Sequence, residues 1–284
     1  MKETITVTHH QPDGTPAVHA ATGPGTPAIK VPASPVTHLV CDCDGVLVDS
    51  EAVADEAMVS ALFATLTAAQ SPQAVTNRPI THAAVETEVG ARLGLTIDHV
   101  IAAVADCFGI TLTAAAQDSV RLAVEAAVRA RQTAVPGVTQ ALHALAASDL
   151  PLAVASNSTL PRVQEAVVVA GIAELVGERI YTGERVAHPK PAPDVYVAAC
   201  AGFKAPPAQC AAVEDSVTGV TAAAGAGMQV IGFAGGTHLG DARAHATLLH
   251  AAGASWVFED MRHLTAILAA LRAGKAPEPR YLLL

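Results

Sequence analysis

The sequence predicts an α/β protein, with a doubly wound parallel sheet as its core and an all-helical insertion after the first strand. Two observations predict this architecture. From about residue 135 onward, short apolar and β-branched runs alternate with helical stretches, which is typical of parallel sheets whose strands are connected by helices. Residues 51–131, in contrast, show helical periodicity and no strand pattern. The length of 284 residues suits one large domain or two smaller ones.

The first predicted element is a buried strand that ends in two carboxylates. The apolar run 39–41 (LVC) leads directly into Asp42 and Asp44, and Gly45 follows. Apolar and β-branched residues before a glycine predict a strand, and a glycine lets the backbone turn sharply or lie close to a ligand. Open α/β sheets bind ligands at the carboxyl ends of their strands. Taken alone, the two aspartates fit a pair of active-site carboxylates and a structural role as turn and helix-cap residues equally well.

The remaining elements follow from the same patterns, taken in chain order. Within the insertion, the predicted helices cover residues 51–69, 82–93, 97–107 and 113–131. The later predicted strands cover residues 150–155, 179–182, 210–213, 229–233 and 256–258, and the later helices cover residues 138–147, 161–170, 193–202, 217–225, 241–250 and 261–273. The predicted domains are a flexible N-terminal extension (1–35), a core (36–50 and 132–274), a helical cap (51–131) and a C-terminal tail (275–284).

Composition and charge disfavour several classes of partner. The net charge of −9, with only five lysines in the chain, disfavours binding to nucleic acid. No apolar run reaches the roughly 18 residues that a membrane span needs, and five cysteines without regular spacing do not resemble a disulfide framework. The N-terminus lacks the basic and apolar segments of a signal peptide. We expect a cytoplasmic protein with neither nucleic-acid nor membrane partners, and the oligomeric state stays open.

Three further motifs fall at predicted strand ends or ahead of helices. Ser156-Asn157 combines hydroxyl and amide groups at the start of a helix, which suits phosphate binding, although such a cluster taken singly is more often a helix cap. Lys190 lies between two prolines, which stiffen the backbone around it. Glu214-Asp215 ends a later strand. Each motif places polar or charged groups where the predicted sheet exposes them.

Together, these residues predict a site for phosphoryl chemistry. Four carboxylates at neighbouring strand ends repel one another unless a cation lies among them. An all-oxygen ligand set favours Mg²⁺, and a phosphoryl group bound to that ion would also contact Ser156 and Lys190. One aspartate could attack the phosphorus as a nucleophile, and the other could protonate the leaving oxygen and then activate water. The four carboxylates are Asp42, Asp44, Glu214 and Asp215.

In combination, the motifs resemble those of the haloacid dehalogenase (HAD) superfamily, in the subgroup with a helical cap inserted after the first strand. The matching segments occur in the family's order and are residues 42–51 (DCDGVLVDSE), Ser156-Asn157, Lys190-Pro191 and Glu214-Asp215-Ser216. With their framework they cover about residues 36–260. The resemblance implies a Rossmann-like core, Mg²⁺ as cofactor and a small phosphorylated metabolite as substrate.

The resemblance also implies a role for each motif residue. Asp42 would be the nucleophile that forms an aspartyl-phosphate, and Asp44 would be the general acid and base. The implied phosphate-binding residues are Ser156, Asn157 and Lys190. The implied Mg²⁺ ligands are Asp42, the backbone carbonyl of Asp44, Asp215 and, in a supporting role, Glu214.

Departures from the family pattern favour hydrolysis over related reactions. Dehalogenases lack the second aspartate, which is present here as Asp44. Phosphonate-cleaving members use a cap lysine, and residues 51–134 contain none. The β-phosphoglucomutases carry a histidine and a cap arginine where this chain has Ala54 and Ile97. The chain resembles sugar-phosphate or phosphogluconate-type phosphatases, and a phosphosugar mutase or a non-catalytic binding protein with the same fold are the alternatives.

The cap is expected to select the substrate, because the core supplies the chemistry and a cap closes over the rest of the molecule. The polar cap residues that we predict to contact substrate are Arg78, Arg92 and Thr96. Arginines on helix surfaces are usually solvated. A solvated surface position is therefore the alternative role for the two arginines.

Overall fold

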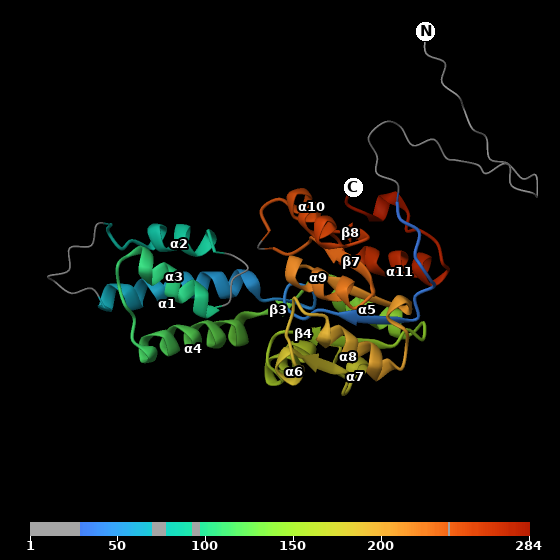
Figure 1. The fold of residues 1–284 in the computed structure, drawn as a ribbon, viewed down its shortest axis with the longest axis horizontal. Coiled ribbons are helices and arrows are strands. Elements are labelled where there is room, and N and C mark those ends of the chain that lie inside the picture. Colours follow the sequence, from blue (N-terminus) through green and yellow to red (C-terminus); the bar gives the residue numbers. More distant parts are fainter. Residues whose placement is uncertain (1–28, 70–77, 93–96, 238) are drawn as a thin grey trace, which may run out of the picture.

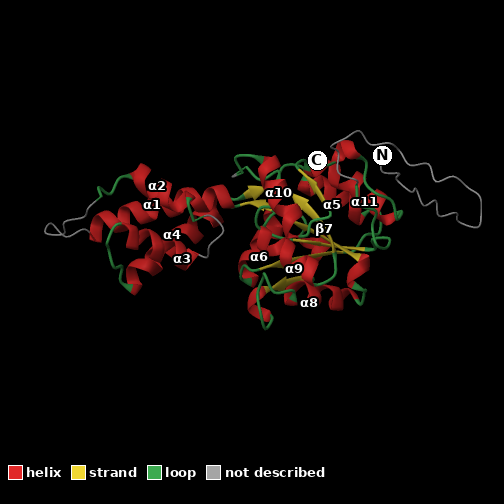
Figure 2. Cartoon of the chain, turned by 45° about the horizontal axis from the view of Figure 1, so that its top comes forward, coloured by secondary structure: helices red, strands yellow, loops and turns green. Residues whose placement is uncertain are grey.

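The computed structural model describes residues 29–69, 78–92, 97–237 and 239–284. In this part of the chain, a six-stranded parallel sheet lies between two layers of helices, and a group of further helices lies to one side of it (Figure 1, Figure 2). The strands of this sheet are β1 (His38–Cys41), β4 (Leu152–Ser156), β5 (Ile180–Thr182), β6 (Cys210–Glu214), β7 (Gln229–Phe233) and β8 (Trp256–Phe258). The predicted α/β fold is confirmed.

The strand β1 lies near the centre of the sheet, whose order is β5-β4-β1-β6-β7-β8. It pairs in parallel with β4 on one side and with β6 on the other, so that Leu39 lies opposite both Leu152 and Ala211. The chain passes from β1 to β4 and β5, and then returns to β6 on the other side of β1. Ligands bind at the crevice where the strand order reverses in this way. The carboxyl ends of β1 and β6 are therefore the expected location of a site.

The two helical layers follow from the alternation of side chains along the strands. Leu39 and Cys41 belong to the hydrophobic cluster on one face, and Val40 belongs to the cluster on the other face. The helices of the first layer are α5 (Val138–Ala146), α6 (Leu160–Val169), α7 (Ala173–Val176) and α11 (Leu264–Arg272). Those of the second layer are α8 (Asp194–Phe203), α9 (Val217–Gly225) and α10 (Ala242–Ala252). Both clusters consist mainly of alanine, valine and leucine.

The helices beside the sheet have a hydrophobic cluster of their own. They are α1 (Glu51–Ala69), α2 (His82–Gly90), α3 (Ile97–Cys107) and α4 (Ala114–Arg131). Their buried side chains, among them Leu62 and Val124, contact one another and form a cluster separate from those of the sheet. Two short strands, β2 (Val48–Asp49) and β3 (Thr133–Ala134), pair antiparallel where the chain leaves and re-enters the core. The sequence patterns did not predict β3, because a strand of two residues has no periodicity.

The sequence led us to expect no apolar segment as long as a membrane span, and helix α1 differs from this expectation. It has 19 residues and a mean hydropathy of 1.3, so among the described helices it is the one that meets the length and composition of a membrane span. Its residues Met58, Val59, Leu62 and Leu66 are buried in the cluster of α1–α4. Core helices of other proteins share this length and composition, and 22% of the span-length stretch of α1 is buried.

Both ends of the described chain contact the edge of the sheet near β8. The indole nitrogen of Trp256 donates a hydrogen bond to the carbonyl of Lys30 at 3.0 Å. The side-chain amide of Gln229 donates to the carbonyl of Ser34 at 2.8 Å. At the other end, the backbone N–H of Leu283 donates to the carbonyl of Val257 at 2.8 Å. Residues 29–35 of the predicted extension are thus attached to the core, and residues 1–28 lie outside the described residues.

Replacing Leu62 with alanine should destabilise the protein, because Leu62 is fully buried in the cluster of α1–α4. We expect the free energy of unfolding to fall by about 2–5 kcal/mol, measured by urea denaturation followed by circular dichroism. Leu122→Ala on α4 is the control, since Leu122 is 64% exposed, and should change stability by less than about 0.5 kcal/mol. Equal effects of the two substitutions would contradict the assignment of Leu62 to a packed core.

Candidate active site

The carboxyl ends of β1 and β6 bring three predicted acidic residues together. Asp42 follows β1, Glu214 is the last residue of β6, and Asp215 follows it. One carboxylate oxygen from each residue lies within 4.8 Å of those of the other two, and all three residues are buried. The backbone N–H of Asp42 donates to the carbonyl of Val213 at 2.9 Å, so the pairing of the two strands fixes this placement.

Lys190 lies against the acidic group and supplies a buried positive charge. Its Nζ donates hydrogen bonds to Asp42 Oδ1 at 2.5 Å, Glu214 Oε1 at 2.6 Å and the carbonyl of Ala155 at 2.9 Å. Burial opposes the charge of the ammonium group, but the two carboxylates outweigh burial and raise the pKa of Lys190 above its ordinary value. The hydroxyl of Tyr196 donates to the same Glu214 oxygen at 2.6 Å. No sequence pattern pointed to Tyr196.

Three carboxylates face a single lysine, and their excess negative charge suits the acidic group to a divalent cation. Burial, followed by the charge of Glu214, raises the pKa of Asp42 to about 8, although Lys190 opposes the increase. Burial and the charge of Asp42 raise the pKa of Asp215 well above its usual range. A bound cation would favour the ionised form of both aspartates. The oxygen-only donor set of Asp42, Glu214 and Asp215 fits a hard ion such as Mg²⁺.

A glycine leaves room for the Asp215 carboxylate beside the first strand. Gly45 has a φ of +78°, a backbone conformation that side chains other than glycine rarely adopt. A Cβ atom at this position would overlap the Asp215 carboxylate. The glycine of the predicted motif therefore keeps the space in which Asp215 approaches Asp42.

Asp44 is held apart from the acidic group by three hydrogen-bond donors. Ser50 Oγ and Arg162 Nη2 donate to Asp44 Oδ1 at 2.6 and 2.5 Å, and Ser158 Oγ donates to Oδ2 at 2.7 Å. Burial alone would raise the pKa of Asp44. The charge and hydrogen bond of Arg162, with the two serine hydroxyls, outweigh burial, so the pKa of Asp44 lies below its ordinary value.

The three residues predicted to bind phosphate lie next to one another. Ser156, the last residue of β4, is buried, and its Oγ accepts a hydrogen bond from the backbone N–H of Ser158 at 3.0 Å. The Asn157 side chain accepts from the Lys190 N–H at 2.9 Å and donates to the Lys190 carbonyl at 3.1 Å. Asn157 thereby fixes the backbone of Lys190, a contact that the sequence did not predict. The phosphate-binding role of these residues stays a prediction.

Arg78 and Arg92, two of the residues predicted to contact substrate, both pair with Glu88. Arg92 also donates to the sulfur of Cys107 at 3.0 Å, and the guanidinium group of Arg78 lies 5.4 Å from the centre of the Phe108 ring. The two arginines thus share one carboxylate. Their role toward substrate stays a prediction. The third residue, Thr96, lies outside the described residues.

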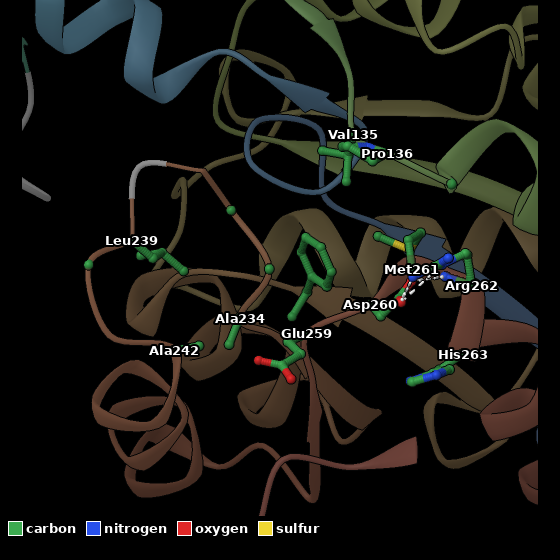
Figure 3. Close-up of a pocket in the computed structure, with 15 residues that line it drawn as sticks. Val135, Pro136, Ala234, Leu239, Ala242, Glu259, Asp260, Met261, Arg262 and His263 are labelled. Atoms are coloured by element: carbon green, nitrogen blue, oxygen red, sulfur yellow. Dashed lines mark hydrogen bonds and ion pairs between the residues drawn. The ribbon is translucent and has the colours of Figure 1, made fainter. Parts of the chain in front are cut away.

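A hollow of about 700 Å³ lies at the carboxyl ends of the neighbouring strands β7 and β8 (Figure 3). Its walls include Phe233 and Glu259 and, across the opening, Val135 and Pro136. None of the described residues predicted for the site lines this hollow. The candidate active site is therefore defined by the convergence of its side chains at β1 and β6.

Comparison with known proteins decides the family. The sequence profile described as haloacid dehalogenase-like hydrolase matches residues 36–227. The chain belongs to this hydrolase family. The resemblance of the sequence motifs is thus confirmed. The family membership also agrees with the acidic group at β1 and β6, which could bind a divalent metal.

Three relatives illustrate the range of similarity within the family. A haloacid dehalogenase-like protein of solved structure from Agrobacterium tumefaciens is 31% identical with a TM-score of 0.67, and the match covers 83% of this chain and 99% of that chain. Protein CbbY of Rhodobacter capsulatus is 41% identical over 100 residues, covering 34% of this chain and 44% of the relative. Hexitol phosphatase A of Escherichia coli is 32% identical over 99 residues, covering 35% of this chain and 45% of the relative. The chain spans less than half the length of these two curated relatives.

Gly45→Ala should weaken the binding of Mg²⁺, because the new methyl group would displace the Asp215 carboxylate. We expect a loss of affinity of about 10- to 100-fold, measured by isothermal titration calorimetry. Gly109→Ala, after α3, is the matched control, since Gly109 also has a positive φ (+67°) and an added Cβ meets open space there. An unchanged affinity in Gly45→Ala would show that Asp215 does not hold the ion.

Proposed function

We propose that the protein is a Mg²⁺-dependent phosphatase that hydrolyses a small phosphomonoester, a sugar or sugar-acid phosphate, through an aspartyl-phosphate. The observation that carries the proposal is the pairing of Asp42 with Lys190 inside a buried acidic group, with Asp44 held separately nearby. The family supports hydrolysis. A relative named hexitol phosphatase A supports phosphorylated sugars as the substrate class.

In the first half of the proposed reaction, a carboxylate oxygen of Asp42 attacks the phosphorus. The bond between phosphorus and the leaving oxygen breaks, and Asp44 in its carboxyl form donates a proton to that oxygen. In this proposal, Lys190, Ser156 and Asn157 hold the phosphoryl group. A bound Mg²⁺, held by Asp42, the carbonyl of Asp44, Asp215 and Glu214, would offset negative charge on the phosphoryl oxygens.

In the second half, water attacks the phosphorus of the aspartyl-phosphate. Asp44, now a carboxylate, takes a proton from the water, and the phosphorus–oxygen bond to Asp42 breaks. Inorganic phosphate leaves, and the Asp42 carboxylate is restored. The two aspartates therefore have different tasks, and their surroundings differ accordingly: Asp42 pairs with a lysine, and Asp44 pairs with an arginine.

The proposal is tested by measuring release of inorganic phosphate from a panel of phosphorylated metabolites. We expect hydrolysis of a sugar or sugar-acid phosphate that requires Mg²⁺ and stops with a chelator. Asp42→Asn should lower kcat by at least about 10³-fold, as expected when a covalent nucleophile is removed. Asp106→Asn, at an exposed position of α3, is the control and should leave kcat unchanged.

Three outcomes would contradict the proposal in different ways. Full activity of Asp42→Asn would exclude the aspartyl-phosphate route. An isomerised phosphosugar in place of free phosphate would favour a phosphosugar mutase. Absence of turnover on every substrate, including p-nitrophenyl phosphate, would favour a non-catalytic binding protein.

A further inference from the structure

We propose that Arg162 is a positioning residue that holds Asp44 for the second half of the reaction, in which Asp44 takes a proton from water. The inference rests on the proposed function. Arg162 lies in the first turn of α6, and its Nη2 donates to Asp44 Oδ1 at 2.5 Å. The two side chains are 27% and 21% exposed, so solvent screens this ion pair only in part.

The three donors to Asp44 come from different segments of the chain. Ser50 lies between β2 and α1, Ser158 lies in the loop after β4, and Arg162 belongs to α6. A serine hydroxyl rotates freely, whereas the guanidinium group is planar, permanently charged and forms the stronger bond to a carboxylate. Arg162 is therefore the donor that contributes most to the orientation of the Asp44 carboxylate.

The three contacts fix the orientation of the Asp44 carboxyl group. Donors engage both of its oxygens, and one of them carries a positive charge. A carboxyl oxygen with a fixed orientation is what the attacking water needs as its base. The oxygen of the water bonds to phosphorus, its proton moves to Asp44, and the electron pair of the breaking bond returns to Asp42. Loss of Arg162 should therefore slow this step above all.

Arg162 also lies toward helix α4. The competing explanation for its role is therefore structural, namely that it holds α4 against α6. Burial opposes its charge, but the carboxylate of Asp44 outweighs burial and the more distant Glu125 on α4 adds to the effect, so the pKa of Arg162 is raised. An ion pair joins α4 and α6, from Arg129 Nε on α4 to Glu165 Oε2 on α6 at 3.0 Å. Helix α4 returns to the core beside α6 (Figure 1). A merely structural Arg162 would hold α4 against α6, as Arg129 does.

The test uses the full chain with Mg²⁺ and p-nitrophenyl phosphate, comparing the wild type with Arg162→Ala, Arg162→Lys and Arg129→Ala. The p-nitrophenolate group leaves without needing a proton, so kcat/KM reports formation of the aspartyl-phosphate with little help from Asp44. For Arg162→Ala we expect kcat to fall by about 10²-fold, the scale of general base catalysis, and kcat/KM to change by less than about 5-fold. Rapid mixing should show a burst of one equivalent of p-nitrophenolate per enzyme.

The control variants separate positioning from structural support. Arg162→Lys keeps the positive charge and should recover part of the lost kcat. Arg129→Ala breaks the ion pair between α4 and α6 and should behave like the wild type. A parallel fall of kcat and kcat/KM in Arg162→Ala without a burst, or the same loss in Arg129→Ala, would overturn the role of Arg162 and leave the proposed function intact. An inactive wild type would overturn both.

Discussion

The candidate site depends on one constraint: three carboxylates are buried together at the carboxyl ends of the central strands β1 and β6. Asp42, Glu214 and Asp215 lie within a few ångströms of one another and away from water. Burying charge is costly unless it is paired, and Lys190 supplies a single positive charge. When all three carboxylates are ionised, two negative charges remain, which is the charge that a divalent cation balances. Without that cation, burial keeps the pKa of Asp42 and Asp215 high, so metal binding should release protons.

Much of the surrounding structure maintains this arrangement. The parallel pairing of β1 with β6 sets the distance between Asp42 and Glu214. Gly45 leaves space for Asp215, and Asn157 holds the backbone from which Lys190 extends. Helices α1–α4 have their own hydrophobic cluster and connect to the core through β2 and β3. The proposed chemistry and the predicted selection of substrate thus reside in separately packed parts of the chain.

The sequence predicted those features that leave a local pattern. The strands and helices follow from periodicity. Asp42 and Glu214 belong to short motifs at strand ends, and Lys190 belongs to a short motif between two prolines ahead of a helix. Contacts between distant positions leave no such pattern. Arg162 lies 118 positions from Asp44, and only its place in the first turn of the helix after Ser156-Asn157 could have suggested it. Tyr196 occupies an ordinary apolar position of α8, and its hydroxyl reaches Glu214 because α8 packs on β4, β5 and β1, and β1 lies next to β6.

The central claim is that Asp42 forms a covalent bond to the phosphoryl group. It is tested most directly by quenching the enzyme during turnover, reducing it with borohydride and sequencing its peptides by mass spectrometry. Borohydride reduces an aspartyl-phosphate to homoserine and leaves free aspartate unchanged. The account predicts homoserine at position 42, in an amount that depends on substrate and is absent when substrate is omitted. Modification at Asp44 instead, or none in an enzyme that is turning over, would contradict it.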